Sequence, residues 1–220
     1  MIKVNTLINL FKKNKSTFFT GVPDSILKEL SSYLQNKDKK NHILATNEGA
    51  AVSLGIGYYL STKKIPCIYM QNSGLSNALN PLISIAHEKV YSIPLILIIG
   101  WRGSPRIKDE PQHNVKGQIT ENILKLLNIK YTIIRSNADF KKFDKQIKIA
   151  KKKSSIVACL IEQGTLEKTH KSKKKVNFYN LDKEIFLKTL LFELKKNTKV
   201  ISSTGYNFKK LIYLKNKYKT

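Results

Sequence analysis

The chain has 220 residues, of which 41% are hydrophobic and 25% are charged, and its formal net charge is +25. This length suits one sizeable domain with a fragment, or two small domains. The longest apolar run, residues 93–99, is too short to cross a membrane, and the first residues lack the apolar core of a secretory signal. The composition therefore indicates a cytoplasmic protein without a membrane segment.

The positive charge raises the question of a nucleic-acid partner, but its distribution argues against one. The excess is almost all lysine, spread over helix faces, and residues 141–220 contain no arginine. Lysine, asparagine and isoleucine are enriched together by genomes poor in G and C, so compositional drift explains much of the charge. A basic chain alone is a weak indication of nucleic-acid binding.

Strands and helices alternate along the first 162 residues, as the apolar periodicity shows. The predicted strands are residues 17–20, 42–45, 66–70, 94–100, 130–134 and 155–162. The predicted helices are residues 4–14, 24–36, 48–62, 73–87, 118–127 and 139–153. Six strands separated by helices predict a doubly wound α/β fold with a six-stranded parallel sheet. Cys67 and Cys159 fall within predicted strands, which is typical of reduced core cysteines.

The sequence changes in character after residue 162. Residues 163–181 are rich in lysine and show little apolar periodicity, which is typical of a solvated linker. A helix at 182–196, a strand at 199–203 and a last helix are predicted to follow. Such a unit is too small to close a core of its own. We therefore expect a first domain over 1–165, a basic linker over 166–181 and an incomplete α/β extension over 182–220.

Ligands of open parallel sheets bind beyond the carboxyl ends of the strands, and the first predicted strand ends in a turn at residues 20–25. Gly21 permits a tight turn, Pro23 presets the backbone, and Asp24 or Ser25 can cap the next helix. By itself this motif is typical of a capping turn.

The second and third predicted strands also end in polar residues. Glu48 begins the helix that follows the second strand, where an acid also complements the helix dipole. Residues 71–77 form a small, polar turn that opens the next helix. Its backbone amides can bind an anion or a polar ring, and the structural alternative is a helix cap by Ser73.

The fourth predicted strand ends in a long, charged loop at residues 100–113, and ordered loops of this length are often functional. Its cations, which suit an anionic substrate, are Arg102, Arg106 and Lys108. His113 can exchange a proton near neutral pH. In the alternative interpretation the loop is solvated, and Asp109 and Glu110 pair with those cations.

Together the four clusters resemble the pyrimidine-binding domain of thiamine diphosphate-dependent decarboxylases. They look most like phosphonopyruvate decarboxylases, with sulfopyruvate decarboxylases as the nearest relatives. The motifs that carry the resemblance are residues 19–25, 46–51, 69–74, 100–103 and 109–113. The likeness is strong over residues 1–165 and weak over 182–205. It implies decarboxylation of 3-phosphonopyruvate to phosphonoacetaldehyde and CO2 with thiamine diphosphate and Mg2+.

The resemblance also implies roles for individual residues. Glu48 would activate the aminopyrimidine ring, Asp24 would relay protons, and His113 lies where related enzymes carry a histidine motif. The residues expected to line the cofactor are Gly21, Val22, Pro23, Gln71, Asn72, Ser73 and Gly74. Charge and position add three candidate substrate contacts, which are Arg102, Lys108 and Gln112.

The sequence departs from the family in one respect, because it contains no Gly-Asp-Gly motif. In the family this motif marks the diphosphate-binding domain, whose Asp and Asn hold the Mg2+. The resemblance therefore implies half a site here, with no metal ligands of its own. A homo-oligomer or a diphosphate-domain subunit would complete it, and a small anionic 2-oxo acid would be its substrate. Three interpretations stay open: a truncated decarboxylase, one subunit of a split enzyme such as sulfopyruvate decarboxylase, or an inactive fragment that serves as a basic binding module.

Overall fold

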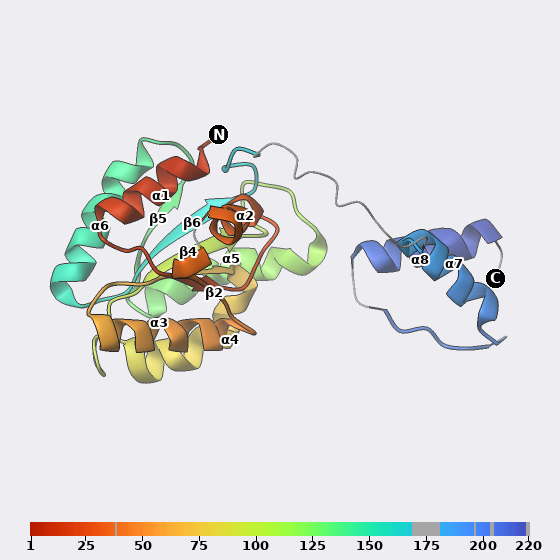
Figure 1. Cartoon of the computed structure of the whole chain (residues 1–220), viewed down its shortest axis with the longest axis horizontal. Coiled ribbons are helices and arrows are strands. Elements are labelled where there is room, and N and C mark those ends of the chain that lie inside the picture. The colour runs from red at the N-terminus through yellow and green to blue at the C-terminus, as the bar shows by residue number, and fades with distance from the viewer. Residues whose placement is uncertain (38, 169–180, 196, 203–204, 219–220) are drawn as a thin grey trace. The chain divides into compact units, whose positions relative to one another are not determined.

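The computed structural model describes residues 1–37, 39–168, 181–195, 197–202 and 205–218 (Figure 1). The chain divides into two compact units, residues 1–169 and residues 170–220. The predicted site residues all lie in the first unit. No helix in the described ranges is both long enough and apolar enough to span a membrane.

The first unit is built on a six-stranded sheet in which all neighbours run parallel. The strand order is β2-β1-β3-β4-β6-β5. The strands are β1 Phe19–Gly21, β2 His42–Leu44, β3 Cys67–Gln71, β4 Ile96–Trp101, β5 Lys130–Ile134 and β6 Val157–Glu162. The predicted doubly wound α/β fold is therefore confirmed.

Alternation along the central strands explains why helices cover both faces of this sheet. Cys67 and Tyr69 of β3 join one buried cluster, whereas Ile68 and Met70 join the other. Every residue of β4 and β6 is buried. A strand that is apolar on both sides must be covered on both sides, as parallel sheets generally are.

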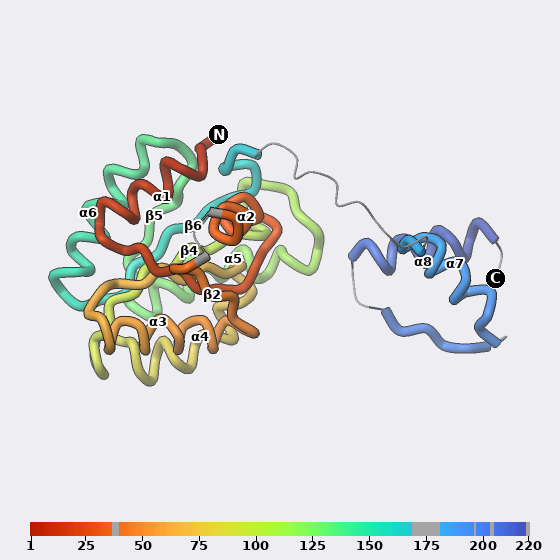
Figure 2. Tube along the Cα trace, in the orientation of Figure 1, coloured from red at the N-terminus to blue at the C-terminus, as the bar shows by residue number. Residues whose placement is uncertain are grey.

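The helices divide between the two faces according to the buried clusters that they join. The first cluster includes residues of α1 Val4–Lys13, α2 Lys28–Lys37 and α6 Asp139–Lys153. The second includes residues of α3 Glu48–Thr62, α4 Leu75–Pro81 and α5 Pro111–Leu126. Figure 2 shows α1 beside α6 and α3 beside α4. Short helical turns at Lys39–Asn41, Asn72–Gly74 and Leu82–Ala86 complete the unit.

The helix predicted at 24–36 begins only at Lys28, and two further helices differ from the sequence prediction at a proline. The helix predicted at 118–127 begins at Pro111, since proline at the first helical position has no amide hydrogen that needs an intrahelical partner. The helix predicted at 73–87 is divided, and a π-helical turn at Leu82–Ala86 follows Pro81. As a result Gln112 and His113 lie in the first turn of a helix and not in a loop.

The described part of the second unit contains two helices, α7 Lys183–Glu193 and α8 Tyr206–Tyr218. They are joined by the ion pair of Lys210 with Glu184 at 2.6 Å and by an edge contact of two aromatic rings. The strand predicted at 199–203 is wrong for its described part, since residues 199–202 form no strand. Val200 and Ile201 are exposed there, with no described strand beside them to pair with.

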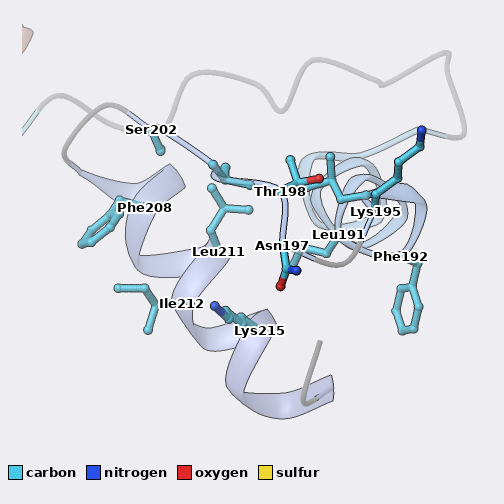
Figure 3. A pocket seen from close by; sticks show the side chains of 12 residues that line it. Leu191, Phe192, Lys195, Asn197, Thr198, Ser202, Phe208, Leu211, Ile212 and Lys215 are labelled. Atoms are coloured by element: carbon cyan, nitrogen blue, oxygen red, sulfur yellow. The ribbon is translucent and has the colours of Figure 1, made fainter.

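A cavity of about 660 Å³ lies within the second unit, between side chains of α7, of α8 and of the segment that precedes α8 (Figure 3). Its lining includes Leu191, Phe208, Leu211 and Ile212. None of the predicted site residues contributes to it. Most of the predicted linker, residues 169–180, lies outside the described residues, whereas Leu166 is buried and bridges to Ile2 in the first unit.

Candidate active site

The four predicted clusters meet at one edge of the sheet, because parallel strands place their carboxyl ends together. Contacts between the clusters join the turn after β1, the start of α3, the turn after β3 and the end of β4. The pairs in contact are Ser25 with Arg102, Asn72 with Arg102, Asp24 with Gly100, and Glu48 with Gly74. The edge lies where the chain connections from β1 and β3 diverge, the position at which such folds bind ligands.

Glu48 is the first residue of α3 and is half-buried. Asn47 caps this helix by accepting a hydrogen bond from the amide of Ala50 at 2.8 Å. The side-chain amide of Asn77 donates to Oε2 of Glu48 at 2.8 Å. Among the described residues nothing donates to Oε1, so one carboxylate oxygen is held in place and the other is available to a ligand.

Gly74 explains how the Glu48 carboxylate fits against the turn after β3. A Cβ at position 74 would lie 2.3 Å from Cγ and 2.5 Å from Oε1 of Glu48. Only glycine leaves room for the carboxylate there. The backbone of this turn therefore forms a cradle for Glu48, and this arrangement fits the role of a carboxylate that meets a cofactor ring.

The neighbouring residues of the same turn have different environments. Gln71 and Ser73 are half-buried, and the Gln71 amide donates to Oγ of Ser73 at 2.7 Å. Asn72 is buried, and its side chain bonds both backbone groups of Arg102 and the hydroxyl of Thr120. Gln71 and Ser73 can reach a ligand, whereas the Asn72 side chain ties β3, β4 and α5 together.

The turn after β1 is shaped by Tyr69. A Cβ on Gly21 would lie 2.1 Å from the Tyr69 carbonyl oxygen and 2.6 Å from its ring, so the ring crosses β1 over this glycine. The Tyr69 hydroxyl lies 2.8 Å from Nε2 of His42, and burial raises the pKa of Tyr69 to about 12. Val22 is half-buried and Pro23 is exposed, so both border the edge of the sheet.

Asp24 is buried and lies in the turn before α2, which begins at Lys28. Its Oδ2 accepts from the amides of Ile26 at 3.0 Å and Leu27 at 3.2 Å. Burial raises the pKa of Asp24 above its ordinary value, although these amides and the Arg102 charge oppose the rise. An acid that holds its proton more tightly suits proton transfer, yet the same oxygen also accepts two backbone hydrogen bonds within the turn before α2.

We expect Asp24→Asn to gain stability relative to the wild type as the pH rises. The folded state holds the Asp24 proton more tightly than the unfolded chain, so its contribution is lost as pH rises above the ordinary value of 3.8. Asparagine keeps the accepting oxygen and has no charge to bury. Urea unfolding measures the free energy of unfolding of both proteins at about pH 4 and about pH 7. The value for the variant, relative to that of the wild type, should be higher at pH 7 than at pH 4.

Asp144→Asn provides a control of opposite sign. The hydrogen bond from Lys148, with further bonds from Asn14 and Lys13, lowers the pKa of Asp144 to about 2. The stability that Asp144 contributes is present above its unfolded pKa and is lost as pH falls. The free energy of unfolding of this variant, relative to that of the wild type, should therefore be lower at pH 7 than at pH 4. A parallel response of the two variants would contradict the assignment for Asp24.

The loop after β4 is anchored by an ion pair. Arg102 donates from Nε and Nη2 to the two carboxylate oxygens of Asp109, and the first of these bonds is 2.7 Å long. Arg102 also donates from Nη1 to Oγ of Ser25 at 3.1 Å. Asp109 therefore pairs with one of the loop cations, Arg102, as the alternative interpretation of the loop predicted. Lys108 and Gln112 are exposed, and His113 is half-buried.

Two contacts of the site were not predicted as such. Asn77, which holds Glu48, lies 29 residues away from it in the sequence, and Thr120 lies 48 residues from Asn72. No local pattern marks either pair. Within the described ranges no group of three or more His, Cys, Asp or Glu side chains is placed to hold a metal ion.

Comparisons with known proteins agree with this geometry. Residues 4–125 match the family described as thiamine pyrophosphate enzyme, N-terminal TPP binding domain. The chain is 37% identical to a phosphonopyruvate decarboxylase of Streptomyces viridochromogenes over 123 residues, which are 56% of this chain and 30% of that protein. It is 33% identical to sulfopyruvate decarboxylase subunit alpha of Methanocaldococcus jannaschii, over 56% of this chain and 70% of the relative.

A solved structure shows the same fold. Benzoylformate decarboxylase from Polynucleobacter necessarius superposes with a TM-score of 0.61 at 20% identity, over 86% of this chain and 36% of that one. The chain thus matches under two fifths of the length of this structure, and 30% of the Streptomyces relative.

Proposed function

The chain belongs to the thiamine pyrophosphate-dependent decarboxylase family, with the N-terminal TPP binding domain at residues 4–125, and we propose that it supplies the pyrimidine-binding half of a decarboxylase site. The substrate we propose is 3-phosphonopyruvate, which would give phosphonoacetaldehyde and CO2. The alternative substrate is sulfopyruvate, since a relative with that activity in its name is as similar over a comparable segment.

The observation that carries the proposal is the position of Glu48. Asn77 holds Oε2 of the carboxylate, Gly74 leaves room for it, and Oε1 accepts no hydrogen bond from the described residues. A carboxyl so placed can share a proton with a ring nitrogen of the aminopyrimidine. When bound, thiamine diphosphate would supply the electron sink for the electrons left by CO2, and Glu48 would activate it.

The other residues at this edge orient the reactants. Gln71 and Ser73 belong to the turn whose Gly74 packs against Glu48, and Asp24 lies against Gly100 at the end of β4. The exposed Lys108 and Gln112 and the partly exposed Arg102 offer donors to the acidic end of a small 2-oxo acid. His113 stands in the first turn of α5, within the same loop region, as a candidate proton donor.

A second domain would complete the site. Glu48 is half-buried in this chain, whereas its role requires a pocket that excludes water. Ile43 and Leu44 of the edge strand β2 and Leu54 of α3 are exposed apolar side chains on elements beside it. We propose that a diphosphate-binding domain, from another copy or another subunit, covers this face and brings the Mg2+ ligands. The Methanocaldococcus relative is itself a subunit, in accord with a split arrangement.

A substrate panel tests the proposed reaction. The tagged chain, isolated from its source cell with the proteins that bind it, is given thiamine diphosphate, Mg2+ and phosphonopyruvate, sulfopyruvate or pyruvate. We expect CO2 release from phosphonopyruvate in preference to the other two. Preference for sulfopyruvate would assign the alternative substrate. CO2 release from pyruvate alone would contradict a specificity for substrates that have a second anionic group.

A further inference from the structure

Asp109 is the most heavily bonded carboxylate at the site. Its Oδ2 accepts from Nε of Arg102 at 2.7 Å and from the amide of Gly103 at 2.9 Å. Its Oδ1 accepts from Nη2 of Arg102 and from the amide of Glu110 at 2.8 Å. Both oxygens thus accept two hydrogen bonds, which fills the acceptor positions of a carboxylate. The hydrogen bonds from Arg102 hold the pKa of Asp109 well below its ordinary value.

Arg102 retains donors that this pairing does not use. A guanidinium has five N–H groups. Asp109 takes one from Nε and one from Nη2, and Ser25 takes one from Nη1. Of the remaining two, one belongs to each Nη nitrogen, and neither has an acceptor among the described residues. The Arg102 side chain is 19% exposed, so a small molecule can reach it.

The backbone of Arg102 is fixed as firmly as its side chain. Its amide donates to Oδ1 of Asn72 at 3.1 Å, and its carbonyl accepts from Nδ2 of Asn72 at 2.9 Å. Through Ser25, Asn72 and Asp109, the residue is joined to the turn after β1, the turn after β3 and its own loop. Its two remaining donors therefore have a defined place at the edge of the sheet that carries Glu48.

We propose that Asp109 is a positioning residue that holds one side of the Arg102 guanidinium, so that the remaining N–H groups bind the phosphonate or sulfonate end of the substrate. This rests on the proposed function only for the identity of the anion. Under this proposal Asp109 strengthens anion binding, although its negative charge by itself would weaken it. Simple electrostatics predicts that removing a carboxylate beside Arg102 strengthens anion binding, whereas loss of orientation weakens it.

Phosphorus NMR titration of the full chain with phosphonoacetate measures this binding without cofactor or turnover. We expect a saturable shift for the wild type and its loss in Arg102→Ala. Asp109→Asn should bind about tenfold more weakly, although it is more positive, and Asp109→Glu should recover part of the affinity because it restores a charge-assisted pair. Asp144→Asn, which removes the same charge from the remote ion pair with Lys13 and Lys148, should bind like the wild type.

Three other binding results contradict the proposal. Equal or tighter binding by Asp109→Asn would show that Asp109 only competes for Arg102. No saturable binding by the wild type, or undiminished binding by Arg102→Ala, would exclude Arg102 as the anion contact. Circular dichroism of each variant shows whether its fold is retained, and Asp109→Glu provides the comparison if Asp109→Asn unfolds. Failure of decarboxylation with this binding pattern intact would reject the proposed function and leave the positioning role standing.

Discussion

Glu48→Gln should slow activation of thiamine diphosphate by about 10²–10⁴-fold, because a glutamine amide is neither an acid nor a base near neutral pH and cannot share a proton with the aminopyrimidine. The change keeps the size of the side chain, and its amide oxygen can still accept from Asn77. The measurement is exchange of the thiazolium ring proton with deuterium, followed by NMR in the isolated complex. The fold should be unaffected, so the thermal transition of the variant should match that of the wild type.

Glu88→Gln is the matched control for this experiment. Glu88 also accepts a hydrogen bond from an asparagine side chain, Nδ2 of Asn128, at 2.7 Å. It follows the π-helical turn and belongs to none of the four clusters. Its substitution should leave the exchange rate unchanged. If both variants exchanged at the wild-type rate, Glu48 would have no part in activating the cofactor.

Gly117→Ala should cost about 3 kcal/mol or more in the free energy of unfolding. A Cβ at this position would lie 1.6 Å from the carbonyl oxygen and 2.1 Å from the carbonyl carbon of Gly103. Both atoms belong to the backbone, so no rotamer change relieves the clash, and the loop that carries Arg102 and Asp109 must move away from α5. Urea unfolding measures the loss. The emission of Trp101, whose indole donates to the Gly117 carbonyl at 2.9 Å, should shift as well.

Gly57→Ala is the control for the glycine substitution. A Cβ at position 57 meets no atom within 4 Å, and the residue lies exposed within α3. Alanine should therefore stabilise the protein by about 1 kcal/mol through its helix propensity. A Gly117→Ala protein as stable as the wild type, with unshifted Trp101 emission, would contradict the close packing of the loop on α5.

Local pattern was sufficient to predict the parallel sheet and the convergence of the four clusters at one of its edges. The helices at Glu48–Thr62 and Asp139–Lys153 and the strand Lys130–Ile134 have the predicted bounds. The clusters converge because parallel strands share one edge, which follows from the fold class alone. The start of α5 at Pro111 was missed, since its first two turns have few buried residues to mark a period.

The contacts inside the site depend on tertiary packing that no short pattern records. Asn77 reaches Glu48 across the interface of α3 and α4, and the close approach at Gly74 is a backbone property. The sequence left open whether the loop cations bind a substrate or pair with Asp109 and Glu110. A carboxylate near three cations has no preferred partner until the loop folds. The strand predicted at 199–203 shows the converse error in its described part, residues 199–202, since β-branched residues with no described strand beside them do not form one.

Decarboxylation by the wild-type chain and by Glu48→Gln, each assayed alone and with the proteins that co-purify with it, tests the central claim most directly. If the chain supplies the pyrimidine half of the site, CO2 is released from phosphonopyruvate or sulfopyruvate only when the wild-type chain and its co-purifying partner are present together. The Glu48→Gln variant, prepared in the same way, should bind the partner and release almost no CO2. Release by the wild-type chain without a diphosphate-binding domain, or equal release by Glu48→Gln in the complex, would contradict the assignment of this chain as the activating half.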